Sequence, residues 1–447
     1  PMVAGTWTGT MCLTEPHCGS DLGLLQTCAE PSEDGSYSIT GSKIFISSGE
    51  HDLADNIVHV TLARVKGAAA GTRGISLFLV PKFLPNEQGE WIIRNPVSCG
   101  AIEEKMGIHG NATCSINFDG AKGFLIGLEN KGLNCMFTFI NESRIDVCLQ
   151  AQGQIERAYQ GSLSYARERL QMKATPRVLV GKPADPIIAH ADIRRLLLTQ
   201  RCFSDGARLM SYDLARLVDL IRADAADKPA SEAMLGFLTP IAKGFITEAA
   251  IEATHQGVQV YGGHGYITET GMEQLVRDVR ITAIYEGTTA IQGIDLITRK
   301  IIADDRQQFD YFREMILAFC DDAQMVLPRQ TKRYLEYVHL WHEVTNKLLP
   351  RVIKDPDEAN ACSVDYLMLS GYVLMGFYLF KSASCAQGML SEDEPLKQDV
   401  GFYMSKIDNL NFYLDKILPR TTSLSETISA GAQCYKTLHG MDFNLSS

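Results

Sequence analysis

Hydrophobic and polar positions alternate in short runs along the first quarter of the chain. Glycine-containing turns separate these runs, four of which stand out: residues 37–40, 57–60, 75–80 and 114–118. Short alternating segments bounded by turns are typical of strands that bury one face. Because no helical period lies between them, an open parallel sheet with crossover helices is disfavoured. We therefore predict a β-sandwich or β-barrel domain over residues 1–125.

From about residue 132 onward the hydrophobic spacing changes to the period of α-helices. Three long helices are predicted: residues 141–171, 191–222 and 231–261. Pro240 lies inside the third helix and should kink it or delay its start. Residues 126–303 are expected to form a helical bundle, and residues 304–447 an additional C-terminal helical domain. The predicted fold class is therefore α+β, with the β-barrel or β-sandwich domain first.

Composition and charge narrow the classes of function. The net charge of −11 and the lack of a basic run argue against nucleic-acid binding. The 12 cysteines include no Cys-x-x-Cys pair, which disfavours a zinc ribbon and indicates a reducing compartment. The most apolar stretch, residues 366–380, is shorter than a membrane-spanning helix of about 20 residues and predicts a buried helix. No signal-peptide pattern precedes Trp7, so we expect a cytoplasmic protein without a transmembrane segment.

Three segments present polar groups in turns or beside glycine. Thr14 and Ser20 belong to a hydroxyl-rich turn, and such turns offer donors to a polar ring or a phosphate. Phe45 and Ser47 share one face of a predicted strand, where the ring can pack on a flat ligand while the hydroxyl donates. The glycine-rich residues 259–266 follow a helix, which is the wrong context for a dinucleotide fingerprint and predicts a helix end with an open loop. Each segment is also compatible with a purely structural role.

A carboxylate stands at the entry of a further predicted helix. Glu286 follows Tyr285 and precedes Gly287, which leaves space beside it, and Thr288 or Thr289 can cap the helix. An apolar pocket would raise the pKa of Glu286 and the helix start would lower it, and the sequence leaves the balance open. A surface glutamate in a helix-entry loop is the structural alternative.

Two arginines of the first long helix, Arg144 and Arg169, have acidic neighbours in the sequence. Such residues can form weak surface ion pairs with those neighbours. They can also contact an anionic ligand. Both interpretations stay open at this point.

Taken together and in order, these segments resemble the acyl-CoA dehydrogenase family. The resemblance rests on motifs spread over residues 7–302: Thr14-Glu15-Pro16 with Gly19-Ser20-Asp21, Gly41-x-Lys43 with Ile46-Ser47, Lys105-Met106-Gly107, Arg144, Arg169, Gln259 with Gly262, Gly263 and Gly265, Arg277-Asp278, and Ile284-Tyr285-Glu286-Gly287-Thr288. Residues 181–188 and the C-terminal extension are similar to the subgroup that contains methylmercaptopropionyl-CoA dehydrogenase and related long bacterial proteins. Family members carry a helical domain before the β domain, so that domain is expected to be missing from a chain that begins at Pro1.

The resemblance implies a role for each site residue. Glu286 matches the catalytic base. Contacts to the substrate are implied for Arg144, Tyr285 and Gly287. Contacts to FAD, some of them across a subunit interface, are implied for Thr14, Ser20, Phe45, Ser47, Arg169, Gln259, Gly263 and Thr288.

The activity implied by the resemblance is FAD-dependent α,β-dehydrogenation of an acyl-CoA thioester to the trans-2-enoyl-CoA, in fatty acid metabolism. It further implies a homodimer or homotetramer in the bacterial cytosol that passes electrons to electron-transfer flavoprotein. Two alternatives stay open: an acyl-CoA oxidase that uses oxygen, and a non-enzymatic flavin-binding relative. A DNA-binding relative of the second kind would need a basic surface, which the acidic charge disfavours.

Overall fold

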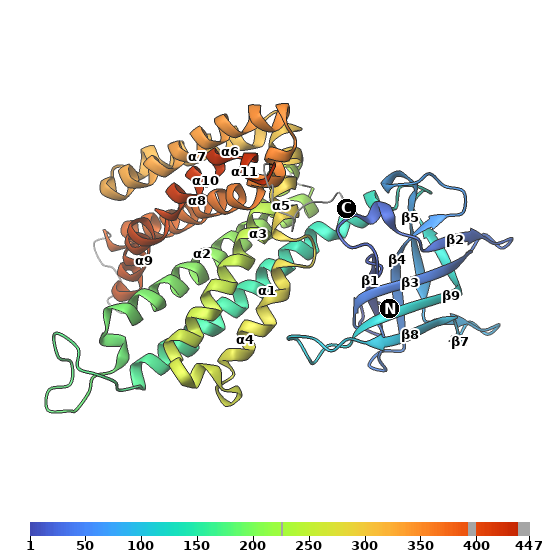
Figure 1. Ribbon diagram of the computed structural model, residues 1–447, viewed down its shortest axis with the longest axis horizontal. Coiled ribbons are helices and arrows are strands. Elements are labelled where there is room, and N and C mark those ends of the chain that lie inside the picture. The colour runs from blue at the N-terminus through green and yellow to red at the C-terminus, as the bar shows by residue number, and fades with distance from the viewer. Residues whose placement is uncertain (225–226, 392–398, 437–447) are drawn as a thin grey trace. The chain divides into compact units, whose positions relative to one another are not determined.

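The computed structural model describes residues 1–224, 227–391 and 399–436. The chain divides into two units, residues 1–142 and 143–447, which we call the β unit and the helical unit (Figure 1). Each unit has its own hydrophobic core.

The β unit is a mixed sheet whose pairings close on themselves. Its strands are β1 (Trp7–Cys12), β2 (Cys28–Pro31), β3 (Tyr37–Ser47), β4 (Asn56–Val65), β5 (Ile75–Pro81), β6 (Phe83–Pro85), β7 (Trp91–Arg94), β8 (Val97–Ile102) and β9 (Thr113–Ile126). Strands β4, β2, β3, β9 and β5 pair in that order, and β5 pairs again with β4. A closed circuit of strand pairings is a barrel. The predicted β-barrel is therefore confirmed, with β1 joined at β4 and β8 at β9.

The four predicted strand segments lie within β3, β4, β5 and β9, and each observed strand is longer than its segment. Their inward-facing side chains build the core of the barrel, which includes Ile39, Phe78 and Phe118. A second cluster on the β unit contains Leu77 and Met136, of which the latter lies in the first turns of α1 (Gly132–Glu168). Strands β4 and β5 are buried along almost their whole length, so their burial exceeds the one buried face that alternation predicts.

The helical unit contains the rest of α1 and ten further α-helices among the described residues. They are α2 (Ala191–Arg222), α3 (Lys228–Tyr261), α4 (Met272–Val279), α5 (Thr289–Asp295), α6 (Gln307–Ala323), α7 (Pro328–Lys354), α8 (Asp357–Leu390), α9 (Val400–Phe412), α10 (Arg420–Ala430) and α11 (Gln433–Lys436). The prediction for α2 is confirmed at both ends. The expected delay of α3 at Pro240 is wrong, because Pro229 occupies the first turn, where proline favours helix entry.

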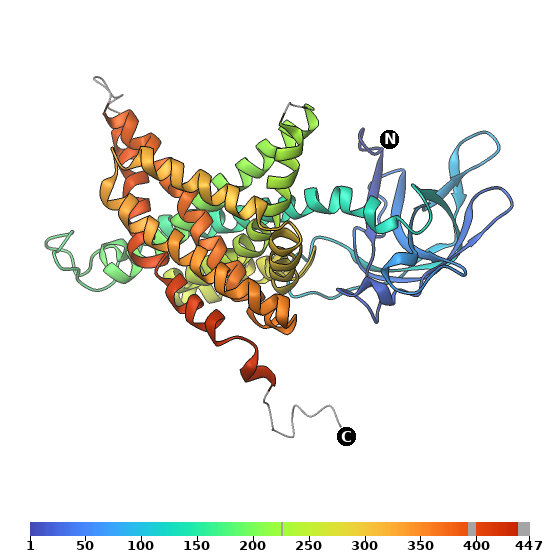
Figure 2. The same ribbon diagram turned by 90° about the horizontal axis from the view of Figure 1, so that it is seen from above.

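Helix α8 packs against α2, α3, α5, α7 and α9 (Figure 2). Two of these contacts leave no room for a side chain. A Cβ on Gly293 of α5 would lie 2.3 Å from the carbonyl oxygen of Ser363, and one on Gly244 of α3 would lie 2.6 Å from a methyl carbon of Leu367. One hydrophobic cluster runs through residues of α1, α2, α3, α6, α7, α8 and α10, so the C-terminal helices share a core with the central ones.

Two helical segments are long and apolar enough to span a membrane by length and composition alone: residues Lys228–Tyr266 and Asp357–Leu390. Their apolar windows are 78% and 83% buried inside the protein, respectively. Burial on all sides is the pattern of a core helix. The buried helix predicted at residues 366–380 is thus present, but it is part of a longer helix, α8, than its apolar stretch indicated.

Candidate active site

The loop before α5 adopts an unusual backbone conformation. Glu286 has φ 55° and Gly287 has φ 95°, so two consecutive residues lie in the left-handed region. Such a conformation is rare for a residue with a side chain, and it occurs often at functional sites. Thr288 then caps α5, since its hydroxyl oxygen accepts a hydrogen bond from the Ile291 N–H at 3.3 Å. Of the two threonines proposed as the cap, Thr288 is the one observed.

Three side chains hold the backbone carbonyls of this loop. The carbonyl oxygen of Glu286 accepts hydrogen bonds from Gln292 Nε2 at 2.9 Å and from Arg144 Nε at 3.3 Å. The carbonyl oxygen of Gly287 accepts one from Lys243 Nζ at 2.6 Å. A Cβ at position 287 would lie 2.5 Å from Gln292 Nε2. Glycine is therefore required at position 287 both by its φ and by the closeness of the amide.

The carboxyl group of Glu286 is half-buried, and burial raises its pKa. Arg144, Lys243 and a hydrogen bond from Ser143 oppose this rise without reversing it. Burial is thus the largest influence on the pKa of Glu286, and its direction is the one expected of an apolar pocket. A raised pKa brings a carboxylate closer to the range that suits a general base at neutral pH.

Arg144 and Tyr285 lie beside this loop. Arg144 is buried and forms an ion pair with Asp295 at 3.6 Å, so a surface ion pair with its sequence neighbours is not its main contact. Burial also lowers the pKa of Arg144. Tyr285 donates a hydrogen bond to Gln150, and burial raises the pKa of Tyr285 to about 12. The structure therefore brings together Arg144, Tyr285, Glu286, Gly287 and Thr288 within the helical unit.

The predicted cofactor residues of the β unit lie near the end of β3 and in the turn after β1. Phe45 is 62% exposed and Ser47 is exposed, on either side of buried Ile46. Phe45 has φ 61° at a bulge in β3, so the bulge adds to plain alternation in setting its direction. Ser20 is exposed, while Thr14 is half-buried and its carbonyl accepts the Ile44 N–H at 3.0 Å.

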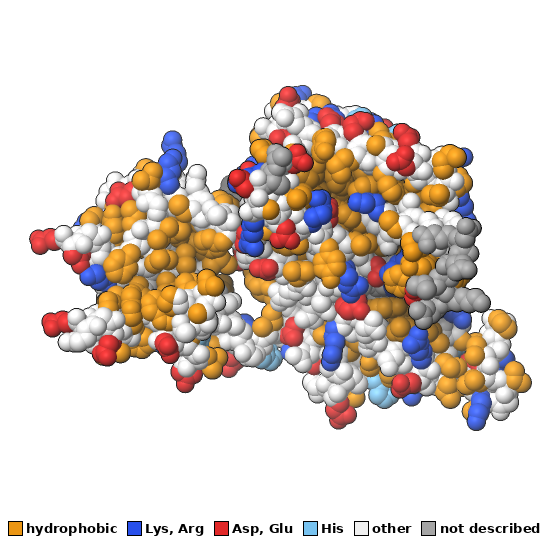
Figure 3. All heavy atoms as spheres, turned by 180° about the vertical axis from the view of Figure 1, so that it is seen from behind, with side chains coloured by type: hydrophobic (Ala, Val, Ile, Leu, Met, Phe, Trp, Pro, Cys, Tyr) orange, Lys and Arg blue, Asp and Glu red, His pale blue; other side chains and the backbone are white. Residues whose placement is uncertain are grey.

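Figure 3 shows hydrophobic side chains at the surface of the β unit and, over the helical unit, Lys and Arg interspersed with Asp and Glu. Exposed aromatic and hydroxyl groups such as Phe45 and Ser47 are free to meet a flat polar ligand. The interspersed charges of this face do not form the basic stripe of a nucleic-acid binder.

The remaining predicted cofactor residues lie at the end of α3 and just after α1. Gln259, Gly263 and Arg169 are all exposed. Gly262 ends α3 with φ 60°, as the glycine-rich segment predicts. A Cβ on Gly263 would meet no atom within 4 Å, so the loop surface is open there.

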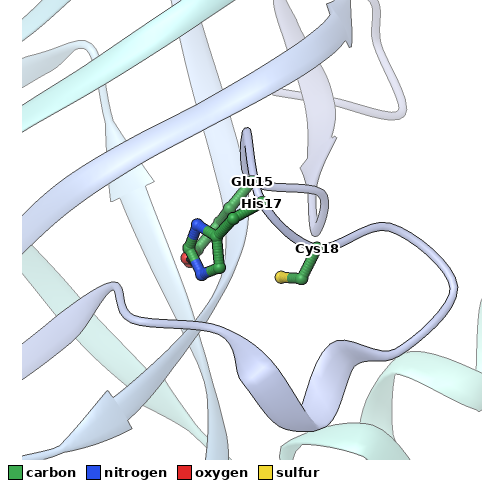
Figure 4. Close-up of side chains that lie close together, drawn as sticks. All are labelled: Glu15, His17 and Cys18. Carbon is green, nitrogen blue, oxygen red and sulfur yellow. Dashed lines mark ion pairs between the residues drawn. The ribbon is translucent and has the colours of Figure 1, made fainter. Parts of the chain in front are cut away.

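Among the described residues, one cluster has the side-chain types of a metal site: Glu15, His17 and Cys18 (Figure 4). The ammonium of Lys43 lies 2.8 Å from Glu15 Oε1 and would repel a cation. His17 Nε2 lies 3.0 Å from the Leu24 carbonyl oxygen, so it carries a hydrogen and offers no lone pair. Burial raises the pKa of Cys18, which disfavours the thiolate that metals require. These groups stabilise the turn after β1.

Sequence reasoning missed three residues that contact the Glu286 loop: Ser143, Lys243 and Gln292. One signal for Lys243 is present in the sequence, since it is the only charged residue in the apolar run 234–247 of α3. A single charge within a buried helix usually has a specific partner. No comparable signal marks Gln292 or Ser143.

Three family models match successive segments of the chain. Their descriptions are "Acyl-CoA dehydrogenase, middle domain" for residues 10–121, "Acyl-CoA dehydrogenase, C-terminal domain" for residues 130–302 and "Acetyl-CoA dehydrogenase C-terminal like" for residues 312–439. The chain is 41% identical over 421 residues to 3-methylmercaptopropionyl-CoA dehydrogenase of Ruegeria pomeroyi, which covers 93% of this chain and 71% of that protein.

Two solved structures share the fold. Caenorhabditis elegans ACDH-11 in complex with C11-CoA has a TM-score of 0.78 at 21% identity, over 98% of this chain and 69% of that one. An acyl-CoA dehydrogenase from Bacillus anthracis complexed with FAD has a TM-score of 0.75 at 21% identity, over 94% of this chain and 69% of that one.

Proposed function

Because the chain belongs to the acyl-CoA dehydrogenase family, we propose that it converts an acyl-CoA thioester to its trans-2-enoyl-CoA with Glu286 as the catalytic base. The family, the subgroup similarity and the α+β fold predicted from the sequence are confirmed. Enzymes of this family are FAD-dependent oxidoreductases. The assignment of roles to individual residues is our proposal.

The observation that carries the proposal is the Glu286 loop itself. A carboxyl group with a raised pKa stands on a left-handed backbone, and hydrogen bonds from three side chains hold that loop. Removing the weakly acidic proton next to a thioester carbonyl requires a base whose pKa lies near the working pH. Position and pKa of Glu286 both suit that task.

The developing negative charge on the thioester oxygen needs donors that are already in place. Among the described residues, no protein acceptor takes the backbone N–H of Glu286, so this group is available to the substrate carbonyl. The nearby guanidinium of Arg144 favours the ionised form of Glu286 before the reaction begins. The chain therefore supplies a base and a hydrogen-bond donor from the same residue.

Each unit by itself carries exposed groups that suit contacts to FAD. Phe45 and Ser47 offer a ring and a hydroxyl at the surface of the β unit, while Gln259, Arg169 and the open loop at Gly263 offer polar groups on the helical unit. When bound, FAD supplies the acceptor for the hydride that leaves the β-carbon. We assign Thr14, Ser20 and Thr288 to the same cofactor, and Tyr285 and Gly287 to the substrate.

A direct test replaces the base and keeps its shape. Glu286→Gln should retain FAD and fail to reduce the flavin when an acyl-CoA is added, because the amide cannot accept the α-proton. The fall in the reduction rate should be on the order of 1,000-fold or more. Flavin bleaching measured by stopped flow reports the rate, and an unaltered rate in this variant would refute the assignment.

The electron acceptor is assigned as electron-transfer flavoprotein, and the assembly as a homodimer or homotetramer in the cytoplasm. An oxidase would return reduced flavin to its oxidised form rapidly in air, whereas a dehydrogenase would do so slowly. Stopped-flow reoxidation in oxygenated buffer separates the two. A panel of acyl-CoA esters with a dye acceptor would identify the chain length of the substrate.

A further inference from the structure

The helical unit buries a lysine whose ammonium binds the loop that carries Glu286. Lys243 of α3 has no exposed surface, and its Nζ donates to the Gly287 carbonyl oxygen at 2.6 Å. Among the described residues, no carboxylate oxygen lies within ion-pair distance of this ammonium. A buried cation bound only to a backbone carbonyl is costly, so a role beyond packing is indicated.

The charged and titratable groups around Lys243 come from three elements. Arg144 and Cys148 face it from α1, Glu286 from the loop before α5, and Glu248 from its own helix. Burial lowers the pKa of Lys243 to about 8, and Arg144 adds to this effect, while the other three groups oppose it. At neutral pH the ammonium is therefore still charged, and Glu286 lies within its field.

Gln292 also contacts the Glu286–Gly287 backbone. Its Nε2 donates to the Glu286 carbonyl oxygen at 2.9 Å and approaches the Gly287 carbonyl oxygen at 3.5 Å. The side chain has no exposed surface, and its Oε1 has no hydrogen-bond partner among the described residues. The Gln292 amide nitrogen therefore contacts the carbonyl oxygens of Glu286 and Gly287, and the buried side chain has little freedom to move.

We propose that Lys243 and Gln292 are positioning residues, which hold the Glu286–Gly287 backbone in its left-handed conformation, and that the charge of Lys243 favours the carboxylate form of Glu286. This inference rests on the proposed function. Left-handed φ at a residue with a side chain persists only where surrounding contacts impose it. Donors on both carbonyls are contacts of that kind, and they fix where the carboxyl group points.

Four variants separate the effect of the hydrogen bonds that hold the backbone from the effect of the charge of Lys243. Lys243→Met removes both donor and charge, Lys243→Arg keeps both, and Gln292→Leu removes a neutral donor. Thr254→Val is the matched control, because Thr254 is also fully buried on α3 but donates only to carbonyls of its own helix. For each, the rate of flavin reduction by saturating acyl-CoA is measured from pH 5 to 9, together with the substrate affinity and the FAD content.

Lys243→Met should lower the maximal rate about 10- to 100-fold, with substrate affinity changed by no more than about threefold. The acidic limb of its pH–rate profile, where activity falls as Glu286 is protonated, should move upward by about one pH unit. The reason is that the carboxylate of Glu286 loses the stabilising positive charge of Lys243. Gln292→Leu should lower the rate by a similar factor and leave the acid limb in place. Lys243→Arg should restore the wild-type limb, and Thr254→Val should match wild type throughout.

A wild-type rate and limb in Lys243→Met would overturn the inference, as would an equal shift of the limb in Thr254→Val. If Lys243→Met yields no folded protein, Gln292→Leu and Lys243→Arg carry the test, and a wild-type rate in Gln292→Leu then rejects the positioning role. Glu286→Gln distinguishes this failure from that of the proposed function. An active Glu286→Gln rejects the base assignment, whereas an inactive one beside a wild-type Lys243→Met rejects only the positioning role.

Discussion

Each unit contains a lysine with no exposed surface, and the two lysines have different partners. In the β unit, Lys43 Nζ donates to Glu15 Oε1 at 2.8 Å and to the Leu13 carbonyl oxygen at 2.9 Å. Glu15 accepts further hydrogen bonds from the Gln26 N–H at 2.7 Å and from the backbone and hydroxyl of Thr27. Burial alone would raise the pKa of Glu15, but Lys43 and these donors lower it. The buried charge of Lys43 is therefore balanced by the carboxylate of Glu15, which is itself fully hydrogen-bonded.

The ammonium of Lys243 in the helical unit donates to a backbone carbonyl oxygen, whereas the ammonium of Lys43 also donates to a carboxylate. A compensated pair fixes the turn after β1, whereas an uncompensated charge keeps its field available to a neighbouring group. Two lysines that are buried to the same extent can therefore have different roles. The partner of a buried charge, rather than its depth, indicates whether the charge stabilises the fold or tunes a site.

Removal of the two ammonium groups should affect the stability of the protein to very different extents. Lys43→Met leaves the Glu15 carboxylate buried without its counter-ion, so it should cost about 3–5 kcal/mol of folding stability. Lys243→Met removes a desolvated charge that has no counter-ion, so its loss should be less than about 1 kcal/mol, or stability should rise. Urea midpoints of the purified variants measure both. Equal losses would show that Lys243 is as structural as Lys43.

The pH dependence of folding stability also reports whether the charge of Lys243 is uncompensated. Because the folded pKa of Lys243 is about 8 and the reference value is 10.5, the folded protein releases a proton that the unfolded chain still holds. Stability should therefore rise between about pH 8 and 10.5, by at most about 3 kcal/mol. Below pH 8 both states are protonated and the full cost of burying the charge is present.

The measurement is the difference between wild type and Lys243→Met across that range, since other groups titrate there too. The stability of wild type relative to Lys243→Met should rise as the pH increases from about 8 to 10.5, because only wild type carries the group that titrates. A gap that stays constant would mean that the ammonium is not desolvated in the folded state.

Much of the fold follows from local patterns in the sequence. The alternating runs gave β3, β4, β5 and β9, and helical spacing gave α2 with its observed ends. Of the two effects expected of Pro240, the delayed start of α3 is wrong, because a proline can be accommodated inside a helix whose other contacts are strong. Local patterns thus predicted these elements, while contacts between distant segments had no such signal.

The site was only partly predictable, because some of its residues are close in space but far apart in the sequence. Glu286, Gly287 and Thr288 are consecutive and form a recognisable string. Lys243 reaches Gly287 from 44 positions away, and Arg144 reaches Glu286 from 142 positions away. Such contacts depend on how α1 and α3 pack, which a single sequence does not encode locally.

The close contact between α5 and α8 offers a smaller perturbation of the helical unit. Gly293→Ala places a methyl group 2.3 Å from the Ser363 backbone, which cannot rotate away, and should cost about 1–3 kcal/mol. Because α5 follows Glu286 directly, the rate of flavin reduction should fall as well. Gly236→Ala on α3 is the control, since the nearest atom to its Cβ is the mobile end of Lys300 at 3.5 Å. Matching losses of urea midpoint in both variants would argue against a strained α5–α8 contact.

The smallest expected effect concerns the base itself. Burial raises the pKa of Glu286 above its reference value of 4.5, so the folded protein holds a proton that the unfolded chain has already lost. The stability linked to this group is fully present below pH 4.5 and falls as the pH rises through the folded pKa. Glu286→Gln never ionises, so at pH 7 it should be more stable than wild type by about 1 kcal/mol.

Thermal unfolding of the FAD-loaded proteins at pH 4.5 and pH 7 checks the sign of this effect. The stability gained by Glu286→Gln should be larger at pH 7 than at pH 4.5, because the raised pKa keeps more of the wild-type carboxyl protonated at the lower pH. A gain that is equal at both pH values would trace to packing of the amide. A loss at pH 7 would mean that Arg144 and Lys243 stabilise the carboxylate more than burial destabilises it, and the site would then hold its base as a compensated ion, as the β unit holds Glu15.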